Sequence, residues 1–213
     1  MIMKLLVGIP SLDFVHVDFM DCLIKLVQKL QADKVDFTVW ICKGTLAHVA
    51  RDRIACKAIN EGFTHVLWID ADMIFNPDLL DDLMFSGHDF VTGLACSRRP
   101  PFVLCVFKHV SLEKGCKYYE LSEIPAETFE IQGCGFAGVL TSVEILKQVM
   151  LTYKSCFIPE KIFGEDVAFC VRARELGYRI YCEPSVRLGH IGHNAVYPGE
   201  YERYMDELRK REE

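Results

Sequence analysis

The chain has 213 residues, of which 51% are hydrophobic and 25% are charged, and its 30 acidic and 24 basic side chains give a net charge of −6. This composition excludes disordered and fibrous proteins and predicts one soluble globular domain. The net charge is acidic and the sequence shows no basic stripe that would bind a phosphate backbone, so nucleic acid is not expected as a partner.

The ten cysteines are expected to be buried free thiols. The closest two, Cys96 and Cys105, are too far apart for the CxxC pairs of zinc and redox sites. The N-terminal apolar run is too short for a secretory signal, and no segment approaches the roughly 20 apolar residues of a membrane helix. We therefore expect a cytoplasmic protein without an integral membrane segment; the sequence carries no signal for its oligomeric state.

Strands and helices are predicted to alternate along the first hundred residues. Apolar runs predict strands, and apolar residues at helical spacing predict helices. The predicted strands cover residues 5–9, 37–42, 65–69 and 89–94, and the predicted helices lie at 19–30, 46–60 and 76–84. Because the third run (HVLWI) is apolar throughout, we expect it to be a central parallel strand. The alternation predicts an α/β fold with a mostly parallel central sheet flanked by helices.

The second half of the chain has a different pattern. Three strand-like segments are joined by turns, and three helical segments follow. The strand-like segments are 102–110, 116–121 and 128–133, and the helical segments are 142–150, 166–176 and 200–213. We expect a small antiparallel extension of the sheet here. The charged tail ends without a capping signal, which leaves open that the chain is a fragment of a longer protein.

Two carboxylates, in the triplet Asp70-Ala71-Asp72, come directly after the predicted central strand. Open α/β sheets bind ligands outside the carboxyl ends of their strands. Hard oxygen ligands with open positions suit Mg²⁺ or Mn²⁺ bridging a diphosphate. A D-x-D triplet also arises by chance, so its placement rather than its pattern favours a metal site over a solvated strand end.

Several segments together resemble the GT-A glycosyltransferases, which use nucleotide-sugar donors and carry a D-x-D after a central strand. In chain order they are VGIPS, LAHVARDRIACKA, HVLWIDADM, VTGLACSRRPP, QGCGFAG, GEDVAF and LGHIGH. The resemblance spans nearly the whole chain, and the sequence as a whole is similar to chlorovirus-encoded members that decorate capsid glycans. It implies a single GT-A domain in which residues 1–98 bind the nucleotide sugar and residues 99–213 bind the acceptor. A viral origin would place the protein in the host cytoplasm.

The resemblance assigns donor-binding roles to residues from three segments. It places Pro10 and Ser11 near the uracil and ribose of a UDP-sugar, with Arg51 on the same side. Asp70 would touch the ribose or the metal, and Ala71 would lie beside it. One departure is Asp52, which stands where many relatives carry Asn and leaves the donor contacts of this helix open.

The resemblance also implies a shell around the metal. Asp72 would bind Mn²⁺ or Mg²⁺ directly and His190 would complete the shell, with His193 as the alternative. Arg98 and Arg99 follow a predicted strand end on the same side of the sheet, where paired guanidinium groups could clamp phosphate. Surface charge before a proline turn explains the two arginines equally well.

Glu165 and Asp166 are the candidate catalytic residues, because in GT-A enzymes an acidic pair here faces the acceptor hydroxyl. We favour Asp166 for that contact; the alternative is that both carboxylates only complement a helix dipole. In the glycine-rich segment, Gln132 and Gly133 are candidate sugar contacts. The same segment matches the dinucleotide fingerprint G-x-G-x-x-G, but it does not open the first βα unit as that fingerprint normally does.

These assignments predict a metal-dependent glycosyltransferase that transfers a hexose or deoxyhexose from a UDP-sugar to a glycan hydroxyl. A haloacid-dehalogenase-type phosphatase, with Asp70 as nucleophile, is an alternative. Against it, Met73 replaces the usual Thr of that motif. A catalytically silent module that binds nucleotide sugars or glycans is the second alternative, and the intact Gly-Glu-Asp triplet argues against it.

Overall fold

A seven-stranded sheet forms the centre of the protein, with strand order β2-β1-β3-β10-β5-β11-β8. The computed structural model describes residues 3–111, 113–192 and 195–212. The strands are β1 Lys4–Pro10, β2 Asp36–Cys42, β3 His65–Ile69, β5 Phe90–Leu94, β8 Phe129–Ile131, β10 Gly138–Ser142 and β11 Ile180–Arg187. β1 is parallel to β2 and β3, and β11 is parallel to β5, whereas β10 and β8 are antiparallel to their neighbours. The predicted mostly parallel sheet is confirmed.

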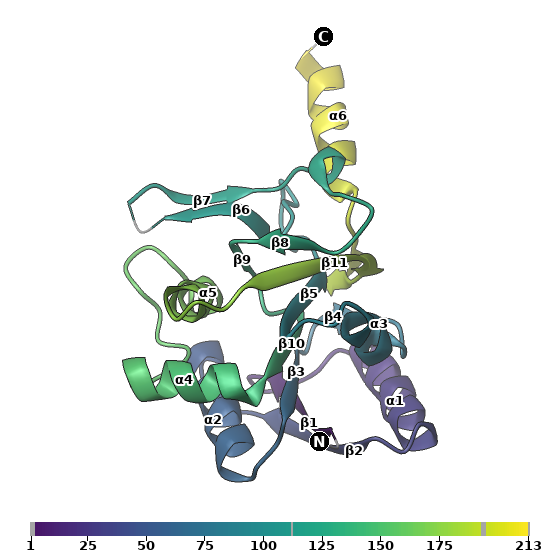
Figure 1. Cartoon of the computed structure of the whole chain (residues 1–213). Coiled ribbons are helices and arrows are strands. Elements are labelled where there is room, and N and C mark those ends of the chain that lie inside the picture. The colour runs from purple at the N-terminus through teal and green to yellow at the C-terminus, as the bar shows by residue number, and fades with distance from the viewer. Residues whose placement is uncertain (1–2, 112, 193–194, 213) are drawn as a thin grey trace.

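Helices cover both faces of this sheet (Figure 1). One face carries α2 Ala47–Asn60, α4 Val143–Tyr153 and α5 Glu165–Glu175, and the other carries α1 Val17–Ala32 and α3 Leu79–Phe85. The period-2 alternation of a strand divides its side chains between the two cores. In β3, Trp68 packs in one core and Leu67 in the other. Burial on both faces, as the sequence analysis expected, explains the apolar run from Val66 to Ile69. The strand is parallel to β1 only, because its other neighbour, β10, is antiparallel.

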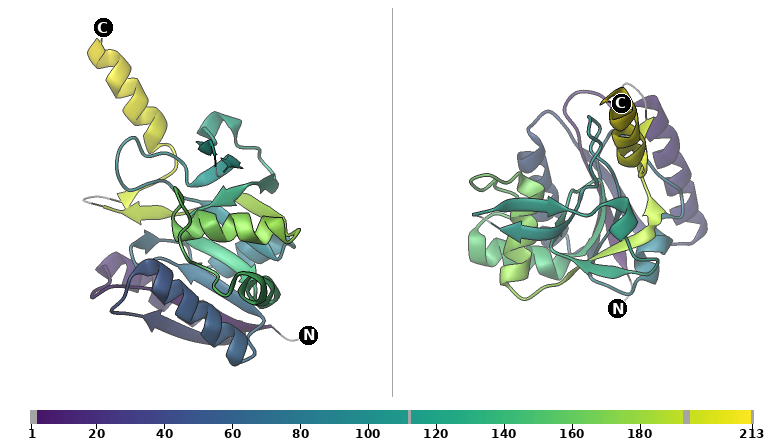
Figure 2. Two further views of the ribbon diagram at one scale, coloured as in Figure 1. Left: turned by 90° about the vertical axis from the view of Figure 1, so that its left-hand side faces the viewer. Right: turned by 90° about the horizontal axis from the view of Figure 1, so that it is seen from above.

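Two small antiparallel sheets accompany the central sheet; the first is the predicted extension of the C-terminal half, and the second, which joins residues 73–74 to a segment that begins at residue 189, was not predicted. One contains β6 Val106–Ser111, β7 Gly115–Tyr118 and β9 Gly133–Cys134, and the other contains β4 Met73–Ile74, β12 Gly189–Ile191 and β13 Ala195–Val196. A short 3-10 helix, η1 Leu121–Glu123, and a final helix, α6 Glu200–Glu212, complete the chain. The last helix projects away from the central sheet (Figure 2).

Two strands of the central sheet, β10 and β11, were not predicted; β10 lies at the end of the glycine-rich segment. A Cβ added to Gly138 would lie 2.7 Å from Leu188 Cδ2, so glycine permits close packing here. The segment therefore leads into a buried strand rather than into the helix that a dinucleotide fingerprint requires.

The ten cysteines are free thiols, as expected, but only seven are buried, because Cys56 is exposed and Cys105 and Cys116 are partly exposed. Among the helices in the described residues, none has the length and apolar character needed to cross a membrane.

Candidate functional site

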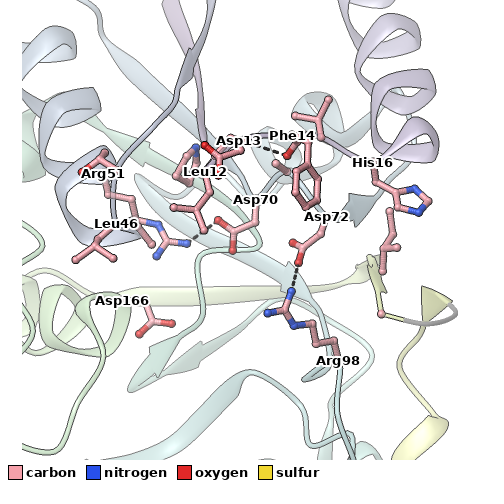
Figure 3. Close-up of a pocket in the computed structure, with 18 of the residues that line it drawn as sticks. Leu12, Asp13, Phe14, His16, Leu46, Arg51, Asp70, Asp72, Arg98 and Asp166 are labelled. Carbon is pink, nitrogen blue, oxygen red and sulfur yellow. Dashed lines mark hydrogen bonds and ion pairs between the residues drawn. The ribbon is translucent and has the colours of Figure 1, made fainter.

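A cavity of about 850 Å³ opens beyond the carboxyl ends of β1 and β3 (Figure 3). This is the edge at which open α/β sheets bind ligands. The cavity brings together nine of the predicted site residues: Pro10, Ser11, Arg51, Asp70, Ala71, Asp72, Arg98, Glu165 and Asp166. They come from strand ends, from α2 and from the first turn of α5, so segments far apart in the sequence form one site.

His190 lies beside Asp72 because β12 pairs with β4. In this antiparallel pair His190 is opposite Met73, and the Ile191 N–H donates to the Asp72 carbonyl oxygen at 2.7 Å. The His190 Nε2 atom is 3.3 Å from Asp72 Oδ2, and its Nδ1 atom is 2.8 Å from the carbonyl oxygen of Cys96. A carbonyl oxygen can only accept, so Nδ1 carries a proton and Nε2 faces the carboxylate.

The charges around Asp72 favour its ionised form. Burial by itself raises the pKa of Asp72, but the hydrogen bond and charge of His190, together with the charge of Arg98, outweigh burial and hold this pKa below its usual value. Arg98 Nη1 donates to the same Oδ2 atom at 2.8 Å. Burial lowers the pKa of His190, but its hydrogen bonds to Asp72 and to the Cys96 carbonyl, together with the negative charges of Asp72 and Asp70, outweigh burial, and this pKa lies above its usual value. Asp72 is thus an anion that already pairs with Arg98 and His190.

The residues around Asp72 fit in part the divalent cation that the GT-A resemblance implies. Within the described ranges, no three His, Cys, Asp or Glu side chains are arranged to hold a metal ion. The side chains of Asp72 and His190 nevertheless lie side by side, with Oδ2 and Nε2 3.3 Å apart, and Arg98 contacts the same Oδ2 atom. Mg²⁺ sites commonly use one or two carboxylates completed by water and substrate phosphates, so the donor set fits a cation that binds together with a nucleotide. His193, the alternative ligand, lies outside the described residues.

Arg51 connects the two acidic segments of the cavity. It is 4% exposed, its Nη2 donates to Asp70 Oδ1 at 2.6 Å, and its Nη1 donates to Glu165 Oε1. Burial raises the pKa of Asp70, and the charge of Arg51 opposes this rise. The phosphatase hypothesis needs Asp70 as a free nucleophile, but this half-buried carboxylate is held in an ion pair with the buried Arg51.

Asp166 differs from its neighbour because it has no ion pair within 4 Å among the described side chains. Its Oδ1 accepts the Val167 N–H at 2.7 Å. Burial raises the pKa of Asp166, Arg51 opposes the rise, and the nearby Glu165 adds to it. A carboxylate with a raised pKa inside a cavity is suited to accept a proton.

The glycine-rich segment reaches the site at a different residue from those predicted. Gln132 and Gly133 do not line the cavity: the Gln132 Oε1 accepts the Val110 N–H at 2.9 Å, within the small sheet. A Cβ added to Gly135 would lie 3.6 Å from Asp166 Oδ2. Glycine at position 135 thus leaves space beside Asp166, and sugar contacts by Gln132 and Gly133 stay a prediction.

One wall of the cavity is apolar, which the sequence analysis missed. The loop after β1 exposes Leu12 and Phe14 by 61% and 87%, and Leu46 at the start of α2 is 63% exposed; all three line the cavity. Apolar residues in the loops before two helices were the available signal, but their exposure and their gathering at one cavity depend on the tertiary fold.

Comparisons with known proteins identify a fold rather than a family. No family model matches the sequence, and no curated protein matches it. A solved structure, A197 from STIV, aligns with a TM-score of 0.64 and 20% identity over 93% of this chain and 92% of that one. The catalytic domain of Drosophila β1,4-galactosyltransferase 7, solved with xylobiose, aligns with a TM-score of 0.51 and 12% identity over 96% of this chain and 73% of that one.

The chain shares the fold of a glycosyltransferase catalytic domain. The predicted GT-A fold class is therefore confirmed, and identities this low show the fold alone. A glycosyltransferase involved in glycosylation of the major capsid of PBCV-1 also aligns, with 14% identity over 68% of this chain and 65% of that one. Its TM-score of 0.35 is too low to support the predicted chlorovirus relationship, which stays a prediction.

Proposed function

We propose that this protein is a metal-dependent glycosyltransferase that transfers a hexose or deoxyhexose from a UDP-sugar to a glycan hydroxyl. The observation that carries the proposal is that Asp72, paired with His190, shares one cavity with Asp166, in a fold that a glycosyltransferase catalytic domain also has. Residues 1–98 would supply most of the donor side and residues 99–213 the acceptor side. A cytoplasmic location, in the host if the gene is viral, belongs to the same proposal.

Asp72 and His190 are the residues that we assign to Mn²⁺ or Mg²⁺. When bound, the ion would neutralise the negative charge that grows on the diphosphate as it leaves the sugar. Asp70 is the third predicted ligand, and its Oδ1 already accepts a hydrogen bond from Arg51. We therefore assign Asp70 a contact to the ribose or the metal through its second oxygen.

The two walls of the cavity match the two ends of a nucleotide diphosphate. Leu12 and Phe14 offer apolar surface for the base next to Pro10 and Ser11. Arg98 has a side chain that is 51% exposed, so its guanidinium is accessible to phosphate oxygens. This division supports a nucleotide-sugar donor with its diphosphate toward Asp72.

Asp166 is the residue that we assign to the acceptor. It would accept the proton of the attacking hydroxyl in an inverting reaction, or hold that hydroxyl in a retaining one. Its raised pKa means that it accepts a proton more readily than an exposed aspartate, and that the activity falls as the pH drops through this raised value.

Calorimetric titration with UDP, GDP and NAD, with and without Mn²⁺, tests the proposal. We expect UDP to bind with micromolar affinity only when Mn²⁺ is present, and Asp72→Ala to lose this binding while it stays folded. Asp89→Ala is the matched control, because Asp89 is an exposed carboxylate away from the cavity.

Three results would argue against the proposal. Binding of NAD without metal would point to a dinucleotide site, and binding of no nucleotide would remove the donor site. Hydrolysis of simple phosphate esters, with a fluoroberyllate adduct trapped at Asp70, would indicate the phosphatase instead.

A further inference from the structure

A buried guanidinium joins the two acidic segments of the cavity. Arg51, on α2, donates to Asp70 after β3 and to Glu165 in the first turn of α5. These partners are 19 and 114 residues away along the chain. One side chain therefore ties together three elements that meet only in the folded protein.

The position of this guanidinium is strongly constrained. It lies over the ring of Phe136, with Cζ 5.6 Å from the ring centroid. Its Nε atom is buried and has no hydrogen-bond partner in the described part of the chain. A buried charge is very costly unless it is paired, so the terminal nitrogens must stay on their carboxylates. Burial lowers the pKa of Arg51, but Asp70, Asp166 and Glu165 outweigh burial and raise it.

Arg51 is poorly placed for the nucleotide contact that the resemblance implies. Its side chain is 5% exposed and both terminal nitrogens are already engaged, whereas Arg98 in the same cavity has a half-exposed side chain. To reach this buried guanidinium, a phosphate would have to enter beside Asp70 and Glu165, two carboxylates that repel it. The two arginines therefore have different tasks.

We propose that Arg51 is a positioning residue that holds Asp70 and Glu165, and so fixes the metal-side and acceptor-side segments relative to each other. Glu165 serves as the anchor of α5, which leaves the adjacent Asp166 to face the substrate. This inference rests on the proposed function for its catalytic consequence. The mechanical part, that Arg51 orders the start of α5, stands on the ion pairs alone.

Hydrogen exchange measured by NMR tests the mechanical part without any substrate. The Ala168 N–H donates to the Gly164 carbonyl oxygen at 3.0 Å, as the first hydrogen bond of α5. In Arg51→Lys, which can hold one carboxylate at a time, we expect this amide to exchange about tenfold faster, because local opening becomes easier. Arg53→Lys, an exposed change on the same helix, is the control and leaves this exchange rate unaltered.

A second variant guards against loss of folding. Glu165→Gln keeps the buried cation and weakens the same link, so we expect faster exchange of the same amide. Unchanged exchange of Ala168 in both Arg51→Lys and Glu165→Gln would overturn the proposal. This result is independent of whether the protein binds a nucleotide.

Kinetics then separate positioning from donor binding. With Mn²⁺ and a UDP-sugar selected by screening the wild-type protein for release of UDP, we expect Arg51→Lys to lower kcat at least tenfold and to leave UDP affinity within about threefold; Arg51→Met should lose more of kcat than Arg51→Lys. Arg98→Met should weaken UDP affinity instead. An Arg51→Lys protein with weakened UDP affinity and an unchanged kcat would overturn the positioning role. Failure of the wild-type protein to bind UDP would count against the proposed function, and the exchange data would still decide the role of Arg51.

Discussion

Replacement of Asp52 on α2 should destabilise the segment that leads to the acceptor side of the site. Asp52 Oδ1 accepts the backbone N–H groups of Cys156 and Phe157, each at 2.9 Å, and Oδ2 accepts the Ser155 hydroxyl. Cys156 and Phe157 are fully buried. The chain between α4 and α5 is thus fastened to α2 by one carboxylate, a few residues before Gly164.

The magnitude follows from these bonds. A hydrogen bond to a charged group contributes about 1.5–3 kcal/mol, and a buried amide that loses its partner costs a similar amount. Asp52→Ala leaves two such amides, and water that enters beside the side chain compensates part of the loss. We expect the free energy of unfolding to fall by about 3–4 kcal/mol, close to the upper end for single substitutions.

Asn is the informative control at this position. Both amides donate to the same oxygen, which an Asn amide oxygen can replace, and the Asn NH₂ group can donate to the Ser155 hydroxyl. Asp52→Asn should therefore cost only about 1 kcal/mol or less. Urea unfolding followed by circular dichroism measures both variants. Equal losses for Ala and Asn, or an Ala variant as stable as the wild type, would refute the reasoning.

Three further variants test the core. Thr141→Val removes the acceptor of the buried Trp68 Nε1 atom, which lies 2.9 Å from Thr141 Oγ1, and should cost about 1–3 kcal/mol in urea unfolding. Gly93→Ala places a Cβ 2.4 Å from Val186 Cγ1 and 2.9 Å from the Val186 carbonyl oxygen, and should lower stability by about 1–3 kcal/mol or more in the same assay. Burial raises the pKa of Glu183, but hydrogen bonds from Ser185 and Thr128 outweigh it, so this pKa lies below the unfolded value of 4.5. The ionised carboxylate therefore stabilises the fold above pH 4.5 and loses this effect as the pH falls through the lower folded value; unfolding from pH 7 to about 3 should show the cost of Glu183→Gln shrinking in acid.

The strands β1, β2, β3 and β5 were predictable because their signals are local, whereas β11, which is parallel to β5, was not predicted. An apolar run such as HVLWI needs only its own residues to indicate a doubly buried strand, and β3 occupies those residues. The strand β10 escaped prediction because Gly138 reads as part of a loop until Leu188 is known to pack against it. When a glycine in a strand is required for close packing, the residue that requires it lies in a distant segment and gives no local signal.

The same distinction explains the candidate site. Asp70 and Asp72 could be found because they follow a strand directly, and strand ends meet at one edge of the sheet. The contacts that complete the site could not be predicted. The Cys96 carbonyl that orients His190 has no side-chain signal, and Glu165 meets Arg51 across 114 residues. From the sequence, the two carboxylates at the start of α5 cannot be told apart, because either can complement the helix dipole. The buried guanidinium distinguishes them, since it engages Glu165 and leaves Asp166 available, and this difference makes the roles of the two carboxylates separable by experiment.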